Sequence, residues 1–200
     1  MAIVNGYCSL ADVKASARIP SADTVDDGLL ELAVESASRM VDSYTQRYFY
    51  SSGTATRLFV PQDSYVTEID DLVSLTTLQT SDGDDFGTTW AAKDYQLEPL
   101  NGVVDGLTGH PATRIRAVDD FLFNVLDGEA TVRITGVYGW SAVPIAVKQA
   151  TVIQAARIFK RNDSPLGIAG FGEMGAVRVG VQLDPDVKHL IDVYRKVRFA

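Results

Sequence analysis

The glycines of GFGEMG, residues 170–175, form the clearest chemical pattern in this sequence. Their G-x-G-x-x-G spacing is typical of loops that bind dinucleotide phosphates. Such a loop follows a strand and opens a helix, so that the helix N-terminus faces the pyrophosphate. Here the stretch follows a helical segment and a Pro-Leu-Gly turn, and it leads into the alternating pattern AVRVGVQL. Because this order is reversed, we predict no nucleotide site and no cofactor.

The histidines and the cysteine form no catalytic or metal-binding pattern. His110 lies in the loop TGHPAT, and His189 lies on the polar side of a helical segment; neither has a second His or Cys at metal-ligand spacing. Cys8 is the single cysteine, which excludes an internal disulfide, and no basic neighbour lowers its pKa. We expect solvated histidines, a half-buried thiol and no metal.

Acidic residues occur in one run and two pairs. The run DGDD at residues 82–85 could bind calcium, but it lacks the spacing and the distal glutamate of an EF-hand loop, so a hairpin turn is favoured. The pairs at 70–71 and 119–120 flank strand-like segments, and we interpret them as surface ends. No G-x-S-x-G or P-loop motif is present. We therefore predict no enzymatic activity, and an enzyme with an unrecognised site remains the alternative.

The composition is that of a soluble globular protein with one domain, or one domain carrying an insertion. The chain has 200 residues and a formal net charge of −8. This charge argues against tight binding of nucleic acid but suits a surface along which DNA slides without sticking. No apolar run is long enough to cross a bilayer, and no secretory signal is recognisable at the N-terminus.

Two helices are predicted in the first quarter of the chain. Ser9 and Asp12 form an acidic variant of a capping box before the first, which Pro20 ends. The second is long and amphipathic, with an apolar face formed by Leu29, Leu30, Ala33, Val34, Ala37, Met40, Val41, Tyr44 and Tyr48. Its opposite face carries Glu31, Glu35, Ser38, Arg39 and Asp42.

Residues 54–136 have the pattern of short strands separated by turns. β-branched and aromatic residues dominate the segments TRLFV, YVTEI, VSLTTLQT, YQLEPL, TRIRAV and ATVRITGVY. Turn residues separate them at 61–63, 81–84, 100–102 and 127–128. This region is predicted to be an antiparallel β-rich module.

Helical periodicity returns at Pro144. Its apolar stripe comprises Ile145, Val147, Val152, Ala155, Ala156, Ile158 and Phe159. Asp184 caps a last helix over residues 185–197. The sequence thus predicts an α+β fold that is mainly a helical bundle, with residues 1–53 and 137–200 as its core and residues 54–136 as an inserted antiparallel β-rich module.

This order of elements resembles the head–tail connector (adaptor) proteins of tailed bacteriophages. The opening SLADVKASARIPSADTVDDGLLELAVESASRMVDSYTQRYF looks like their N-terminal helix pair, and YQLEPLNGVV with ATVRITGVYGWSAVP looks like their β insertion. IAVKQATVIQAARIFKRNDSPLG is similar to their central helix. GFGEMGAVRVGVQLDPDVKHLIDVYRK looks like the C-terminal loop and helix of the actinobacteriophage members. The resemblance covers nearly the full length and includes no catalytic residue.

The resemblance implies a virion structural protein of the neck, at the head–tail interface, made in the host cytoplasm. Such adaptors form a ring, commonly dodecameric, beneath the portal protein. They extend the DNA channel and offer a platform to a stopper or tail-terminator protein. Genomic DNA would pass without specific binding, and no membrane is implied. Another neck component, such as a stopper or tail-completion protein, remains the alternative.

Two segments are predicted to form the assembly interface. We expect residues 167–175 to be mobile in the isolated subunit and ordered on assembly, because glycine loses much conformational entropy on ordering. The C-terminal YRKVRFA combines cations, which helix-dipole complementarity explains, with an aromatic residue that suits an anchor on the portal. The predicted interface residues are Ile168, Phe171, Met174, Arg178, Tyr194, Arg195, Arg198 and Phe199.

Overall fold

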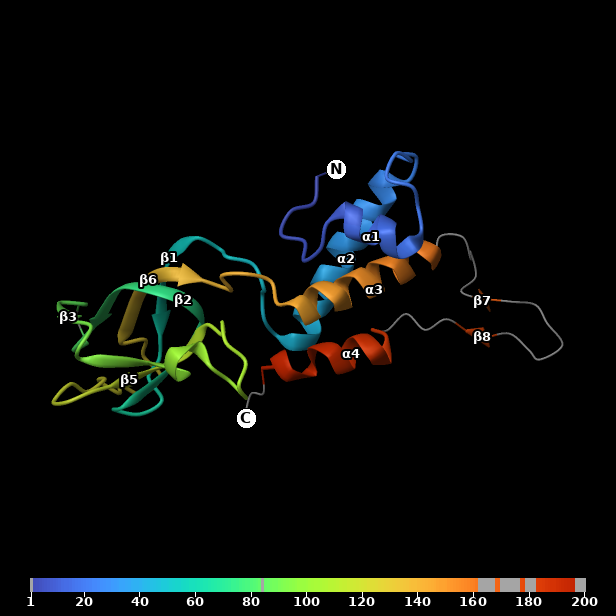
Figure 1. Cartoon of the computed structure of the whole chain (residues 1–200). Helices are drawn as coiled ribbons and strands as arrows, with labels where there is room; N and C mark the ends of the chain where they lie inside the picture. Colours follow the sequence, from blue (N-terminus) through green and yellow to red (C-terminus); the bar gives the residue numbers. More distant parts are fainter. Residues whose placement is uncertain (1, 84, 162–167, 170–176, 179–182, 197–200) are drawn as a thin grey trace. The chain divides into compact units, whose positions relative to one another are not determined.

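A computed structural model describes residues 2–83, 85–161, 168–169, 177–178 and 183–196 (Figure 1). The chain divides into two compact units. The helical unit comprises Met1–Arg47 and Val143–Ala200, and the β unit comprises Tyr48–Ala142. Among the described helices, none is long and apolar enough to span a membrane.

Four α-helices are described in the helical unit. They are α1 (Leu10–Ala17), α2 (Asp27–Thr45), α3 (Ile145–Arg161) and α4 (Pro185–Ile191), which continues into the 3₁₀ turn η2 (Asp192–Tyr194). The predicted capping box is present at the start of α1, since the Ser9 and Asp12 side chains each bond the other residue's backbone N–H. Asp184 caps α4 by accepting from the Asp186 backbone N–H at 2.8 Å. Both caps confirm local sequence signals.

The core of the helical unit is built from small and aliphatic side chains. α2 packs against α3, α1 lies against both helices, and α4 packs against α3. The main buried cluster comprises Cys8, Val13, Leu30, Ala33, Val34, Ala37, Ala155 and Ala156. Four of its eight members are alanines, whose small side chains allow helices to approach closely.

The β unit is a six-stranded antiparallel sheet. Its strands are β1 (Thr54–Phe59), β2 (Val66–Thr80), β3 (Thr88–Trp90), β4 (Tyr95–Glu98), β5 (Ala112–Ala117) and β6 (Val132–Tyr138), with a 3₁₀ turn η1 (Leu100–Gly102) after β4. The strand order is β1-β6-β2-β5-β4, and β3 pairs with β2. β2 therefore joins two halves, because its first part pairs with β5 and its second part with β6.

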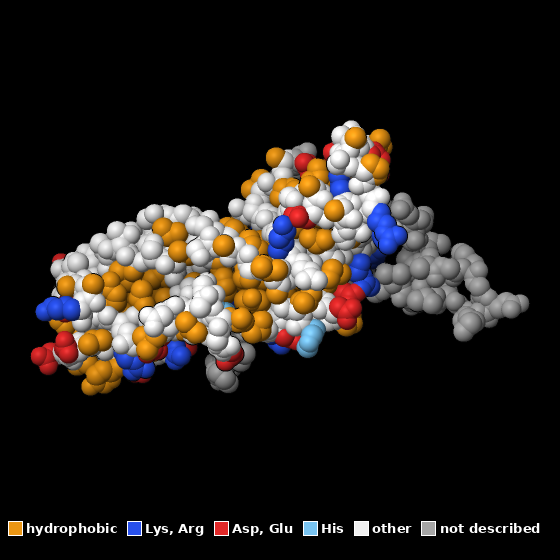
Figure 2. All heavy atoms as spheres, viewed as in Figure 1, with side chains coloured by type: hydrophobic (Ala, Val, Ile, Leu, Met, Phe, Trp, Pro, Cys, Tyr) orange, Lys and Arg blue, Asp and Glu red, His pale blue; other side chains and the backbone are white. Residues whose placement is uncertain are grey.

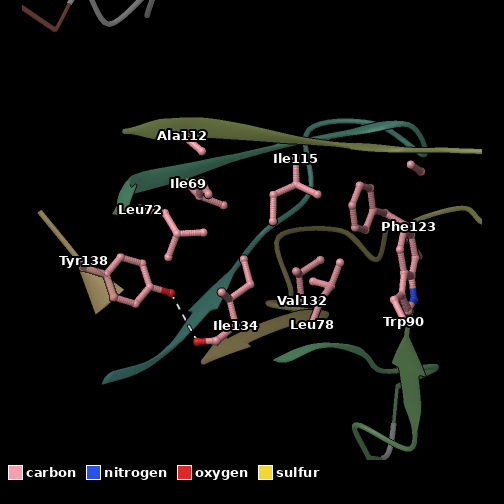
Figure 3. Close-up of a cluster of buried hydrophobic side chains, with 11 residues drawn as sticks. Ile69, Leu72, Leu78, Trp90, Ala112, Ile115, Phe123, Val132, Ile134 and Tyr138 are labelled. Atoms are coloured by element: carbon pink, nitrogen blue, oxygen red, sulfur yellow. Dashed lines mark hydrogen bonds between the residues drawn. The ribbon is translucent and has the colours of Figure 1, made fainter. Parts of the chain in front are cut away.

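The concave side of this sheet encloses an aromatic and aliphatic core (Figure 3). Trp90 and Phe123 stack with ring centroids 4.7 Å apart, and the Tyr138 hydroxyl donates to the Ile134 carbonyl. The cluster comprises Ile69, Leu72, Leu78, Trp90, Ala112, Ile115, Ala117, Phe123, Val132, Ile134 and Tyr138. It contains larger side chains than the helical core, so the β unit has a full hydrophobic core of its own.

The prediction of a mainly helical bundle is wrong. The described part of the chain is 33% helical and 25% strand, and a six-stranded antiparallel sheet stands beside the helices. The error arose because the strand segments were interpreted as separate short strands inserted into a helical core. YVTEI and VSLTTLQT are one continuous strand, β2, which runs through the acidic pair at residues 70 and 71. A strand of this length can serve both halves of the sheet.

The prediction that Asp71 lies at an exposed strand end is also wrong. Its side chain is buried, and Oδ2 accepts a hydrogen bond from the Trp140 indole N–H at 3.1 Å. A buried carboxylate needs such donors. Asp70, the next residue along, points out of the sheet and pairs with Arg57 at 2.7 Å. Successive side chains of a strand point to opposite faces of the sheet, so Asp71 is buried and Asp70 is exposed.

Candidate assembly surface

The structure describes four of the eight predicted interface residues. Ile168 and Arg178 lie opposite each other in a short antiparallel pairing between β7 (Ile168–Ala169) and β8 (Val177–Arg178). Phe171, Met174, Arg198 and Phe199 lie outside the described residues, as does most of the glycine-rich segment. Their predicted roles remain predictions.

Tyr194 and Arg195 lie near the C-terminal end of α2. The Tyr194 side chain is buried, and burial raises its pKa. The Arg195 guanidinium lies 5.6 Å from the centre of the Tyr44 ring, and the Tyr44 hydroxyl donates to Asp192 at 2.5 Å. The Lys196 backbone N–H donates to the Thr45 carbonyl at 2.8 Å. This end of the chain is thus tied to α2 by several contacts.

The N-terminal strap, residues 2–8, covers the side of α2 that the sequence presents as polar. The Tyr7 backbone N–H donates to Ser38 Oγ at 3.2 Å, and the Tyr7 hydroxyl donates to Asp42. Arg39 donates to the Asn5 carbonyl at 2.9 Å. Ser38 and Asp42 are therefore buried, contrary to the solvent face predicted for them. Their partner is more than thirty residues away in sequence, so helical periodicity could not reveal it.

Burial perturbs the carboxyl group of Asp42. Burial raises its pKa from 3.8 to about 6, against the opposing effects of the Tyr7 hydrogen bond and the Arg39 charge. Arg39 Nε lies 3.0 Å from Asp42 Oδ2. The strap is therefore held by a carboxyl group that changes charge near neutral pH.

The first two turns of α2 expose apolar side chains. Leu29 is 46% exposed and Leu32 is 45% exposed, and Val25, just before the helix, is 88% exposed. Leu29, Leu32 and the exposed Ser36 follow helical spacing, and together with Val25 they form what we call the α2 stripe, which the exposed Arg39 continues. The prediction placed Leu29 in the core, which is wrong, because Leu30 and Val34 fill that side.

The acids of α2 do not lie on this stripe. Asp27 pairs with Lys14 at 2.5 Å, and Glu35 accepts from the Val4 backbone N–H. Asp42 contacts Tyr7 and Arg39, as described above. Charged side chains of a solvated helix normally point to water, whereas these are engaged within the unit. An exposed apolar stripe flanked by engaged acids indicates a surface that another molecule covers.

α3 has a similar outer side. Ile145 is 84% exposed, and Gln149 and the half-buried Ile153 follow it at intervals of four residues. We call these three residues the α3 stripe. Figure 2, which views the helical unit from the α3 side, shows orange side chains along α3 with blue ones near its end. The prediction that Ile145 packs in the core is wrong, and Gln154 is buried instead.

The two helices carry opposite charge. α2 has four acids and one base, Arg39, and α3 has four bases and no acid. Two of the α3 bases are paired, Lys148 with Asp12 at 2.9 Å and Arg157 with Asp184. The net charge of the whole chain is −8, so the overall composition does not reveal that α3 is basic.

The remaining chemically reactive groups are held in structural contacts. Burial raises the pKa of the Cys8 thiol to about 12, which leaves almost no thiolate at neutral pH. The His110 ring packs edge-on against Trp140 with centroids 5.1 Å apart. Within the described ranges, no group of three His, Cys, Asp or Glu side chains is arranged to hold a metal ion.

The fold of the whole chain is similar to two chains from solved particle necks. One is in the neck of an empty GTA particle computed with C6 symmetry, with a TM-score of 0.58 and 21% identity over 100% of this chain and 95% of that one. The other is in the neck of a native GTA particle computed with C12 symmetry, with a TM-score of 0.52 and 20% identity over 100% and 94%. At this identity the likeness shows a shared fold. No protein-family model and no curated protein matches the sequence.

Proposed function

We propose that this chain is a structural protein of the neck of a tailed, phage-like particle, and specifically the head-to-tail adaptor. In this role it forms a ring beneath the portal protein, extends the DNA channel and offers a platform to the tail-side stopper or terminator. Genomic DNA passes through without specific binding, which the net charge of −8 supports because an acidic surface repels phosphate.

The observation that carries this proposal is the full-length fold likeness. The likeness extends over both units, since it covers 100% of this chain and 95% of the neck chain in the empty particle. GTA denotes a gene transfer agent, a phage-like particle, and the two similar chains belong to necks with six-fold and twelve-fold symmetry. A ring of repeated copies is the assembly that such symmetry favours.

The test uses particles assembled with and without this chain. We expect heads that lack it to contain a portal but no attached tail, and added purified chain to restore attachment. Cryo-EM of the restored necks should show a ring of this chain between portal and tail. Particles that assemble with tails in its absence, or necks whose ring fits another chain, would contradict the proposal.

The predicted interface residues belong to this proposal as assembly contacts, those of the glycine-rich loop with a neighbouring subunit or the portal and those of the C-terminus with the portal. They are Ile168, Phe171, Met174, Arg178, Tyr194, Arg195, Arg198 and Phe199. Removal of residues 198–200 tests the C-terminal anchor, because the described contacts between residues 192–196 and α2 remain. We expect the truncated chain to keep its melting temperature and to lose affinity for portal-bearing heads. Unchanged affinity would leave helix-dipole complementarity as the explanation of the basic end.

A stopper or tail-completion protein is the second candidate. The complete hydrophobic core of the β unit favours it, since a β module with its own core can act as a separate docking domain. The order of binding separates the two candidates. An adaptor binds portal-bearing heads in the absence of every other neck protein, whereas a completion protein binds only after the adaptor or to the tail.

A further inference from the structure

The two stripes of the helical unit lie on different helices. Leu29, Leu32 and Ser36 on α2 and Ile145 and Gln149 on α3 are exposed. α2 and α3 bury other residues against each other and against α1. One molecule therefore offers two separate exposed stripes.

Neither stripe carries an acidic residue. In a chain with 26 Asp and Glu against 18 Lys and Arg, random surface contacts between copies bring like charges together. Depletion of charge at the centre of a contact is the compositional mark of protein interfaces. The stripes are the parts of these two helices at which copies can approach without burying a carboxylate.

Asp27 and Asp42 of α2 and Lys148 and Arg157 of α3 are paired within the unit, but the two helices carry opposite net charge, and this favours one pairing of the surfaces over the others. Contact between two α2 helices would juxtapose two acidic helices, and contact between two α3 helices would juxtapose two basic ones. Contact between α2 of one copy and α3 of another pairs opposite charge around an apolar centre. A second copy of this chain thus offers each stripe an apolar surface on a helix of opposite charge.

We propose that the α2 stripe of one copy packs against the α3 stripe of the next copy, in a head-to-tail contact. This inference rests on the ring of the proposed function and names the surfaces that would build it. Contacts between two unlike surfaces repeat from copy to copy and close into a ring when the rotation permits. Leu32 and Ile145 are exposed apolar side chains of the two surfaces.

The test introduces a charge into each stripe separately. Leu32→Glu and Ile145→Glu alter exposed side chains, so both variants should fold with unchanged far-UV circular dichroism. We expect each to lower the self-association constant, measured by sedimentation at increasing concentration, by about tenfold or more. Leu58→Glu, at a β-unit side chain that is 55% exposed, is the matched control and should associate as the original chain does.

A mixture of the two variants distinguishes a head-to-tail contact from a symmetric one. Each variant keeps one intact stripe, and the two intact stripes are the complementary ones. The mixture should therefore form a one-to-one dimer that grows no further, at concentrations at which each variant alone is mainly monomeric. If either variant alone dimerises as strongly as the mixture, the contact is symmetric and the inference is wrong.

Two further outcomes separate this inference from the function on which it rests. If both variants form rings as readily as the original chain, the stripes are not the contact, and the proposed ring stands without them. If the original chain neither self-associates nor forms a ring on portal-bearing heads, the adaptor role fails and the inference fails with it.

Discussion

The helical unit and the β unit differ most in how charge and apolar surface are distributed. The β unit contains 14 acidic and 5 basic residues, a net charge of −9. The helical unit contains 12 acidic and 13 basic residues, a net charge of +1. The negative charge of the whole chain is therefore a property of the β unit alone. Composition averaged over the sequence conceals two surfaces with different physical behaviour.

This difference has a structural cause. The β unit buries large aromatic side chains in its own core, and its acids lie mainly in loops and on outward strand positions. The helical unit has a core of small side chains and leaves aliphatic residues exposed on α2 and α3. We infer that the helical unit is the part adapted to association and the β unit the part that stays solvated and repels phosphate.

The largest expected effect is a selective loss of the β unit by Gly139→Ala. Gly139 has φ +102°, and an added Cβ would lie 1.9 Å from the Tyr50 carbonyl oxygen. Backbone cannot move aside as a side chain can, so we expect a loss of more than about 4 kcal/mol. Trp90 and Trp140, the two tryptophans of the chain, both lie in the β unit, so their fluorescence during urea unfolding reports this unit alone.

Gly106→Ala is the control for this substitution. Gly106 also has a positive φ, of +79°, but no atom lies within 4 Å of the added Cβ. Conformational strain alone should cost about 1 kcal/mol. Equal losses for the two variants would mean that the close approach at Gly139 does not exist in solution.

The next effect concerns the helical core. Leu30→Ala removes a fully buried side chain and should cost about 2–5 kcal/mol, whereas Leu29→Ala, at the adjacent exposed position, should cost less than about 1 kcal/mol. Urea unfolding followed by far-UV circular dichroism gives the free energy of unfolding of both variants. If the units are independent, the tryptophan fluorescence of the Leu30→Ala variant unfolds at the original urea concentration. A matching shift in fluorescence would show that the two units unfold together.

A smaller effect is the pH dependence of the helical unit. The pKa of Asp42 is raised to about 6 in the folded chain from 3.8. Its contribution to stability is therefore complete below about pH 4 and is lost as the pH rises through 6, by about 2–3 kcal/mol. Thermal unfolding followed by helicity should show this decline, and Asp42→Asn should remove it. A decline that persists in the variant would assign the effect to another group.

Asp12 should act in the opposite direction. Hydrogen bonds with the Ser9 side chain and backbone, and with Lys148, lower its pKa to about 2. Its contribution is present above pH 3.8 and is lost as the pH falls through 2. Asp42 and Asp12 together predict that the helical unit is most stable near pH 4.

Within the helical unit, the success of sequence reasoning depends on the range of the interaction. The capping box of Ser9 and Asp12 and the cap of Asp184 depend on residues two or three apart, and both are confirmed. The burial of Ser38 and Asp42 depends on Tyr7, which is more than thirty residues away. Periodicity shows that a helix has two sides, but it does not show which segment covers the polar one.

The same reasoning explains the errors in the β unit. β3, at residues 88–90, was missed because three residues are too few for a period of two to be recognised. β2 was divided because two adjacent acids are a turn signal in isolation. The exposed stripes were missed for a different reason. An aliphatic residue at helical spacing is predicted to lie in the core, and the pattern does not show whether its own chain or a partner chain covers it.

The smallest expected effect is that of the exposed ion pair of the β unit. Arg57 Nη1 lies 2.7 Å from Asp70 Oδ2, and their side chains are 37% and 53% exposed. The Arg57 guanidinium also lies 4.0 Å from the centre of the buried Tyr138 ring. Surface ion pairs contribute about 0–1 kcal/mol, and Asp70→Asn also relieves repulsion in a unit of net charge −9. We therefore expect Asp70→Asn to change stability by less than about 0.5 kcal/mol.

Arg57→Met should be worse than Asp70→Asn, because it removes the cation–π contact with Tyr138 and increases the net negative charge. We expect a loss of about 1 kcal/mol in tryptophan-monitored urea unfolding at low salt. Added sodium chloride screens the repulsion among the remaining carboxylates, so it should recover part of this loss in the β unit. The helical unit, with a net charge of +1, should gain little from the same salt. Equal salt responses of fluorescence and helicity would mean that the charge difference between the two units does not affect their stability.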